Sequence, residues 1–373
     1  MAFNLINYIT IYFNYIILIS NNIKFKFLKM KLVIVHLLFL LKILLVSNNL
    51  YADYLNGYKE FENQNYELAF EHWQEGADQN DTLSQFYLAL LYKNGLGVKQ
   101  DYSKAFDLFE IVSDKGLIEG NYNLGLLYYN GLGIEKNYNK AFFNFNIAKD
   151  KIIESYYYLG VMYSESKGVE TDYLKAVNYF QLASENNIDL ANCNLGFIYL
   201  EGLGVPQNYS EAYNYFLKGA KKKISDCQNG LGWLYENGIG VSKSKSEAIR
   251  WYKLAAEQNH KQAQFNLGLF FLKDKSLDEN YQTAIKWFTL AAQQGVLEAQ
   301  YNLGTIYFDG FGVVQNFKKA FANYLLSQKY YVDILVLSNE GIYFAGAWCG
   351  FGFHEDGLKS GLRVCEAFGA SLG

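Results

Sequence analysis

The sequence predicts an all-α protein, a right-handed superhelical α/α solenoid of about seven helix-turn-helix repeats of 36 residues each. Two observations predict this fold. A motif of leucine, a small residue and an aromatic recurs seven times, at spacings of 36, 35, 36, 36, 36 and 36 residues. The 373 residues also include only one proline, as expected of a nearly all-helical chain, because proline breaks the helical hydrogen-bond ladder.

Residues 1–52 are predicted to be a signal peptide or membrane anchor, with translation starting at Met30. The segment that follows Met30 has a basic flank, an apolar run from Leu32 to Val46 and small-residue punctuation that ends at Ala52. His36 and Lys42 weaken the apolar run, so an uncleaved anchor is the alternative to cleavage. We therefore expect an exported protein that is periplasmic, secreted or anchored in the inner membrane. Membrane contact is expected only through this segment.

The first helix of each repeat, the A helix, is built around a small residue that we call the register residue. Leucine precedes it, and an aromatic residue follows three positions later on the same helical face. A small side chain at this point allows two helices to approach closely. The register residues are Ala89, Gly125, Gly160, Gly196, Gly232, Gly268 and Gly304.

A turn and a helix N-cap follow each A helix. Most turns contain Gly-x-Gly but lack the third glycine or the Gly-Lys-Ser/Thr of a nucleotide loop, so they are predicted to be helix C-caps. Twelve residues after the register residue stands an Asp, Asn or Ser that can cap the next helix. These residues are Asp101, Asn137, Asp172, Asn208, Ser244, Asn280 and Asn316. Ser244 and Glu247 have the spacing of a capping box.

The second helix, the B helix, has alanine four residues after the cap and an aromatic residue four positions later. Neither helix can bury its apolar face alone, so the repeats must stack on one another. The solenoid is predicted to span residues 53–331. A partial unit before the first full repeat, "NYELAFEHWQEGADQN", supplies one additional helix.

The pattern L-G-x-x-Y-x-x-G-x-G-V, a capping residue and K-A-x-x-x-F resembles the Sel-like repeat, a relative of the tetratricopeptide repeat. The sixth copy, with "KDKSLDEN", lacks glycine in its turn and is expected to bend differently. The resemblance implies a non-enzymatic scaffold that binds protein or peptide partners. It also implies export, since many bacterial members of the family are exported.

By the geometry of the related tetratricopeptide repeats, the A helices line a concave face. Outward positions on these helices carry a stripe of aromatic side chains, which is the candidate partner-binding site. The alternative is that tight coiling buries the same side chains between repeats. The candidate residues are Tyr122, Tyr129, Tyr157, Phe197, Trp233, Phe265, Tyr301 and Phe308.

No catalytic residue, cofactor or metal site is predicted. The four histidines have no metal-ligand spacing, and a net charge of −4 gives no global basic field for nucleic acid. Cys193 and Cys227 lie on the A helices of neighbouring repeats. We expect two buried free thiols there, with a disulfide as the alternative.

Residues 332–373 depart from the repeat and are predicted to form two short strands around an Asn-Glu-Gly turn, followed by a helix. This tail resembles the C-terminal end of flavin-dependent amine-oxidase-like oxidoreductases. By that resemblance Gly346, Trp348 and Gly357 would be vestiges of a flavin site. The Gly-x-Gly-x-x-Gly that would hold the FAD pyrophosphate is missing, so we interpret the tail as a fused fragment. The alternative function is an incomplete flavin-dependent oxidoreductase fused to a repeat domain.

Overall fold

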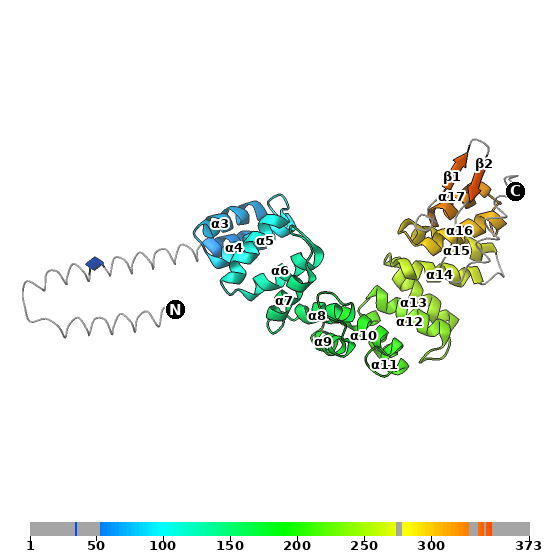
Figure 1. Cartoon of the computed structure of the whole chain (residues 1–373), viewed down its shortest axis with the longest axis horizontal. Coiled ribbons are helices and arrows are strands. Elements are labelled where there is room, and N and C mark those ends of the chain that lie inside the picture. Colours follow the sequence, from blue (N-terminus) through cyan, green and yellow to red (C-terminus); the bar gives the residue numbers. More distant parts are fainter. Residues whose placement is uncertain (1–33, 36–52, 274–277, 328–334, 339–340, 345–373) are drawn as a thin grey trace, which may run out of the picture. The chain divides into compact units, whose positions relative to one another are not determined.

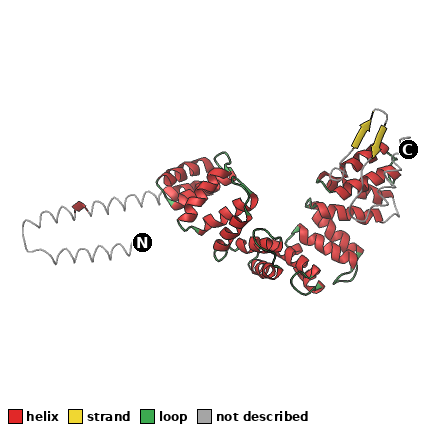
Figure 2. Ribbon diagram, viewed as in Figure 1, coloured by secondary structure: helices red, strands yellow, loops and turns green. Residues whose placement is uncertain are grey.

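The computed structural model describes residues 34–35, 53–273, 278–327, 335–338 and 341–344. The described residues form helices and their connecting loops, apart from one β-hairpin (Figure 1, Figure 2). The chain divides into two compact units, Met1–Ile152 and Ile153–Gly373. The predicted signal or anchor, residues 1–52, lies outside the described residues except for positions 34–35.

The first unit contains three consecutive helix pairs within its described residues. The A helices are residues 53–62, α4 (Thr82–Asn94) and α6 (Ile118–Asn130). The B helices are α3 (Tyr66–Asp78), α5 (Tyr102–Asp114) and α7 (Tyr138–Ala148). Within this unit α3 packs on α4, α4 on α5, α5 on α6 and α6 on α7, as expected of stacked repeats.

The second unit contains five helix pairs within its described residues. The A helices are α8 (Glu154–Ser164), α10 (Leu190–Glu201), α12 (Ser225–Asn237), α14 (Lys261–Lys273) and α16 (Leu297–Asp309). The B helices are α9 (Tyr173–Glu185), α11 (Tyr209–Lys221), α13 (Lys245–Glu257), α15 (Asp278–Gln293) and α17 (Phe317–Ser327). Neighbouring A helices also touch, α10 with α12 and α14 with α16. The predicted all-α solenoid of stacked helix pairs is confirmed.

The predicted pair of strands in the tail is also confirmed. Strand β1 (Leu335–Ser338) pairs antiparallel with β2 (Gly341–Phe344), and Ser338 lies opposite Gly341 across a two-residue connection. The predicted helix of the tail, and with it Gly346, Trp348 and Gly357, lies outside the described residues.

The partial unit at the N-terminus is a complete helix pair, so the prediction of about seven repeats was one too low. The helix over residues 53–62 is the missing A helix, and it packs on α3 through Gly57, where a Cβ would collide with the Trp73 indole. Gly57 occupies the register position, and the N-cap of the B helix, Asn65, follows only eight residues later. In the other repeats the N-cap position lies twelve residues after the register residue. This shorter loop also lacks Gly-x-Gly, so the periodic pattern did not reveal the pair.

The five register glycines from Gly125 to Gly268 each pack against the aromatic residue of their own B helix. A Cβ added to Gly125, Gly160 or Gly196 would come within 2.6–2.7 Å of the nearest ring atom of Phe145, Phe180 or Phe216. These phenylalanines are fully buried. The small residue therefore admits the large one, as the sequence pattern predicted.

Where a turn contains Gly-x-Gly, its two glycines have different roles. The first, such as Gly95 or Gly202, adopts a left-handed conformation at the helix C-cap, where its N–H bonds the carbonyl four residues earlier. The second lies on the start of the preceding B helix: a Cβ on Gly97 would overlap the Tyr66 carbonyl, and one on Gly133 the carbonyl of Tyr102. The turn thus joins neighbouring pairs as well as ending a helix.

The predicted N-caps are confirmed at six of seven positions. The side chains of Asp101, Asn137, Asp172, Asn208, Ser244 and Asn316 accept hydrogen bonds from backbone N–H groups of the following helix. Asn280 was predicted wrongly, because α15 starts at Asp278 and Asn280 lies inside its first turn.

The predicted capping box at α13 is only half formed. The backbone N–H of Glu247 donates to Ser244 Oγ at 3.3 Å, but the Glu247 carboxylate pairs with Arg250 at 2.9 Å. The arginine three residues on competes successfully for the carboxylate that a full capping box would direct back to Ser244.

The expectation of two free thiols was wrong. Cys193 of α10 and Cys227 of α12 form a disulfide, with their Cα atoms 5.0 Å apart. The two A helices approach closely enough here because Gly219 of α11, with no side chain, leaves room for the Cys227 sulfur.

Candidate partner-binding face

All eight candidate residues lie on A helices. Tyr122 and Tyr129 belong to α6, Tyr157 to α8, Phe197 to α10, Trp233 to α12, Phe265 to α14, and Tyr301 and Phe308 to α16. Phe197 and Trp233 are exposed, at 43% and 37% of their surface, and the other six are half-buried. The face therefore matches neither a fully exposed stripe nor one hidden between repeats.

Each A helix of the seven regular repeats carries one aromatic residue on this face, at one of two positions a helical turn apart. It stands three residues before the register residue in five repeats and one residue after it in the other two. Where the earlier position is Cys193 or Asn229, the later one is Phe197 or Trp233. We call this set the aromatic stripe: Phe86, Tyr122, Tyr157, Phe197, Trp233, Phe265 and Tyr301.

Most rings of the aromatic stripe rest on the buried aromatic residue of their own B helix. Ring centroids lie 5.9 Å apart for Tyr122 and Phe145, 6.0 Å for Tyr157 and Phe180, and 5.0 Å for Phe197 and Phe216. Phe86 and Phe265 make the same contact at 5.9 and 5.8 Å with Phe109 and Phe288. One side of each ring thus belongs to the core, while the rest of the ring is partly exposed.

Tyr129 and Phe308 lie outside this pattern, one turn further along their helices. Tyr129 packs 5.4 Å from Tyr138, the first residue of α7, and 6.4 Å from Phe145. Phe308 packs beside Ala320 of α17. Both residues therefore help to join an A helix to the B helix of the same pair.

Buried glutamines four residues before the register residue form a feature that the sequence reasoning missed. Gln228 and Gln264 accept hydrogen bonds from Gln258 and Gln294, the first residues after the B helices of their own repeats, at 2.7 and 2.8 Å. Their own amide groups donate to the carbonyls of Ala220 and Ala256 in the preceding B helices. The recurrence of glutamine at a core-facing position was the available signal. These bonds link each of the two A helices to its own B helix and to the B helix of the preceding pair.

Lysine–tyrosine stacking between the two helices of a pair was also missed. Lys104 lies 5.0 Å from the Tyr92 ring, and the equivalent lysines 140, 175 and 319 lie 5.1 Å from Tyr128, Tyr163 and Tyr307. The recurring lysine before the B-helix alanine therefore stabilises the repeat through a cation–π contact. It belongs to the scaffold rather than to a binding site.

Negative charge gathers on the A helices α8, α10 and α12, which together carry four carboxylates and no lysine or arginine. Asp226 accepts a hydrogen bond from His260 at 3.1 Å, and this bond lowers the pKa of the carboxyl. Glu236 accepts the Tyr252 hydroxyl at 2.9 Å and pairs with Lys273 at 3.2 Å. Glu201 forms no ion pair among the described residues.

The B helices of the same three pairs have the opposite balance. Helices α9, α11 and α13 carry six basic and four acidic side chains. The A helices of these pairs are therefore acidic, while the B helices are weakly basic.

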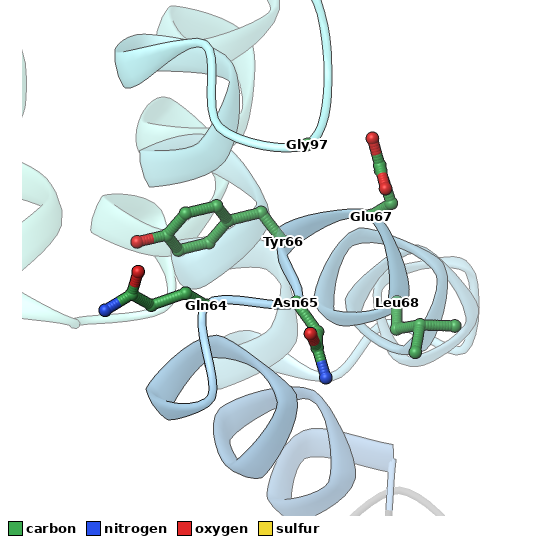
Figure 3. A pocket seen from close by; sticks show the side chains of 6 residues that line it. All are labelled: Gln64, Asn65, Tyr66, Glu67, Leu68 and Gly97. Atoms are coloured by element: carbon green, nitrogen blue, oxygen red, sulfur yellow. The ribbon is translucent and has the colours of Figure 1, made fainter.

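A pocket lies elsewhere, at the start of α3. It is a hollow of about 300 Å³ lined by Gln64, Asn65, Tyr66, Glu67, Leu68 and Gly97. Figure 3 shows Glu67 and Leu68 pointing away from Gln64 and Tyr66, so the lining presents no convergent set of polar groups. Within the described ranges no group of three or more His, Cys, Asp or Glu residues could hold a metal ion.

Comparison with known proteins decides the family. The model of the Sel1 repeat matches residues 46–81, 82–117, 118–151, 153–188, 189–223, 225–260, 261–296 and 297–327. The chain belongs to the Sel1 repeat family. The first matched segment includes the helix pair that the periodic pattern missed, and the match ends before the β-hairpin.

Two solved structures are similar to this Sel1 repeat protein. One is c5321, a protective antigen present in uropathogenic Escherichia coli strains, with 28% identity and a TM-score of 0.61 over 75% of this chain. The chain spans 61% of the length of that protein. The other is a Sel1 repeat protein from Oxalobacter formigenes, with 25% identity and a TM-score of 0.60 over 64% of this chain and 96% of its own. No curated protein matches the sequence.

The comparisons support the predicted class of function but not the predicted origin of the tail. Sel1 repeat proteins typically mediate protein–protein interactions, in agreement with the expected class of function. The resemblance of the tail to flavin enzymes finds no support among them. None of the helices in the described ranges is both long and apolar enough to cross a membrane.

Proposed function

We propose that this protein is an exported, non-catalytic scaffold that binds protein or peptide partners through its A helices, which form the concave face of the solenoid. The observation that carries the proposal is the aromatic stripe, whose rings rest on the core on one side and are partly exposed on the other. Aromatic side chains held in this way are the usual anchors of protein interfaces.

The packing behind the stripe favours binding for an entropic reason. A side chain that loses rotamer freedom on binding costs about 0.5–1.5 kcal/mol, and contact with the buried B-helix aromatics has already ordered these rings. The half-buried stripe is thus preorganised, whereas isolated exposed aromatic side chains would not be.

Export is supported by three observations. Residues 30–52 have the layout of a secretory signal. The Cys193–Cys227 disulfide is of a kind that persists in oxidising compartments and is rare in the cytosol. The third observation is the similarity to the E. coli protein, which is a protective antigen present in uropathogenic strains.

The experiment that tests the proposal compares partner capture by three forms of the full-length protein from a cell-envelope extract. The test variant carries Tyr157→Ala, Trp233→Ala and Tyr301→Ala. The control carries Phe143→Ala, Leu174→Ala and Leu254→Ala, which remove exposed apolar side chains from B helices. Circular dichroism and thermal melting check that both variants are folded.

We expect the native protein and the control to retain the same specific partners and the folded stripe variant to lose them. The proposal fails if the stripe variant keeps every partner, or if the B-helix control is the one that loses them.

A further inference from the structure

We propose that helices α10 and α12 form a docking site for an extended, arginine-containing segment of a partner protein, with Phe197, Trp233 and Glu201 as its recognition residues. This inference rests on the proposed function, because it specifies the partner chemistry for one part of the same face.

The two most exposed rings of the stripe are neighbours. Phe197 and Trp233 hold the same position, one residue after the register glycine, on A helices that touch each other. Their exposed fractions are 43% and 37%, whereas the other stripe residues are half-buried. The stripe is therefore most accessible to a partner at α10 and α12.

The disulfide fixes the spacing of these rings. Cys193 lies one turn before Phe197, and its bond to Cys227 ties α10 to α12 with a Cα separation of 5.0 Å. Packed helices have axes about 8–10 Å apart. Two residues of an extended peptide, whose side chains point to the same face, span about 6.6 Å, and the length of an arginine side chain covers the difference. Two side chains of a partner segment at that spacing can reach both rings.

The negative charge of the A helices around this site favours a positively charged partner segment. Helices α8, α10 and α12 carry Glu154, Glu201, Asp226 and Glu236 with no lysine or arginine. Glu201 lies one turn after Phe197 on the same helical face and forms no ion pair in the described part of the chain. Phosphate groups of nucleic acid or anionic lipid would be repelled here, whereas arginine side chains would be attracted.

The protein contains an internal example of the proposed contact. Arg250 lies over the Trp251 ring, 4.6 Å from its centroid, while it pairs with the Glu247 carboxylate at 2.9 Å.

Trp233 and Phe197 have no cation from the described residues over their rings. The glutamate that follows Trp233, Glu236, already pairs with Lys273, whereas Glu201, four residues after Phe197, forms no ion pair in the described part of the chain. Both rings and the Glu201 carboxylate are therefore open to a cation from outside.

The test uses the purified full-length protein and a fluorescein-labelled nonapeptide with arginine at its fourth and sixth positions, which share one face of an extended chain, in a glycine–serine background. Two matched peptides carry citrulline, which keeps the shape without the charge, or glutamate. Fluorescence anisotropy measures binding at low and high salt. The variants are Phe197→Ala, Trp233→Ala, Trp233→Phe and Glu201→Gln, and Phe143→Ala and Leu174→Ala serve as exposed B-helix controls.

We expect saturable binding of the arginine peptide, weakened by salt and roughly tenfold weaker when Trp233 or Phe197 becomes alanine, because a cation–π contact contributes about 1–2 kcal/mol. Trp233→Phe should retain most of the affinity, and Glu201→Gln should lose several-fold. The B-helix controls and native protein should bind equally.

The proposal is overturned if the citrulline or glutamate peptide binds as well as the arginine peptide, or if Trp233→Ala leaves binding unchanged. If Trp233→Ala abolishes the binding of an uncharged peptide, the cationic docking site is overturned but the proposed function still stands. A dimer that Trp233→Ala dissociates, with no peptide binding, would make a second copy of the chain the occupant and the proposal wrong. Failure of the envelope experiment above would instead remove the proposed function itself.

Discussion

Residue volumes are matched in pairs where a B helix meets the A helix that follows it. In the first unit, a Cβ on Gly76 would overlap the Ser84 side chain, and one on Gly120 would come within 2.8 Å of Val112. In the second unit Gly219 faces Cys227 in the same way. In three other pairs both positions are alanine. The combined volume therefore stays small, because a close-packed interface tolerates little added volume.

Gly219→Ala should destabilise the protein by about 1–3 kcal/mol, the usual consequence of overpacking. The added methyl group would displace the Cys227 sulfur, so the variant should also show more free thiol. Urea unfolding followed by circular dichroism measures the first effect, and thiol titration of unfolded, unreduced protein measures the second.

The rescuing variant is Gly219→Ala with Cys227→Ala, which recreates the alanine pair found at Ala255 and Ala263. Its stability should match that of Cys227→Ala alone. A double variant that is less stable by the full effect of Gly219→Ala would contradict the volume argument.

Neighbouring A helices are joined by covalent and polar links. In the second unit the disulfide ties α10 to α12, and the amide of Asn266 on α14 donates to Asn229 on α12 at 3.0 Å. Because the stripe residues project from these same helices, links between A helices set the spacing of the candidate binding face.

Reduction of the disulfide should lower the stability of the second unit by roughly 3–4 kcal/mol, because the bond closes a loop across a separation of 34 residues. Urea unfolding with and without a phosphine reductant measures the difference, and Cys227→Ala should show none. Equal midpoints for the native protein in both conditions would contradict this expectation.

The same disulfide offers a test of compartment in living cells. If the protein is exported, Cys193 and Cys227 should resist alkylation until a reductant is added. A pair that is alkylated at once would contradict export.

Tyrosines pervade the whole molecule, with 33 in the chain, and several are held protonated by the fold. Burial raises the pKa of Tyr87 in the first unit to about 12. In the second unit a hydrogen bond with Tyr213 raises the pKa of Tyr235 to about 12, and burial raises that of Tyr252. The stability of both units should therefore depend on pH in the alkaline range, because these hydroxyls are protonated in the folded state.

Stability should fall as pH rises from about 10 to 12. The unfolded chain releases tyrosine protons near pH 10, whereas the folded chain holds those of Tyr87 and Tyr235 to about pH 12, so stability is fully present below pH 10 and is lost above it. Urea midpoints measured between pH 8 and 12 test this, and Tyr235→Phe should show a smaller loss. A midpoint constant across that range would contradict the expectation.

The repeat period, the helix pair and the position of each stripe residue on an A helix could all be predicted from the amino-acid sequence. These follow from local chemistry: small residues recur where helices cross, Asp, Asn or Ser recurs at N-caps, and glycine recurs where the backbone must turn left-handed. The prediction of helix pairs and N-caps failed at two places where these local signals are weak. One is the short loop before Asn65, and the other is Asn280, which lies inside α15.

Three features became apparent only from the folded structure: how exposed the stripe is, which polar groups join neighbouring pairs, and the bond between Cys193 and Cys227. Exposure depends on how far a ring leans onto its B helix, and a disulfide depends on the distance between two helices set by Gly219, which belongs to neither. Both are distances between elements, and a one-dimensional pattern of residue types does not contain them.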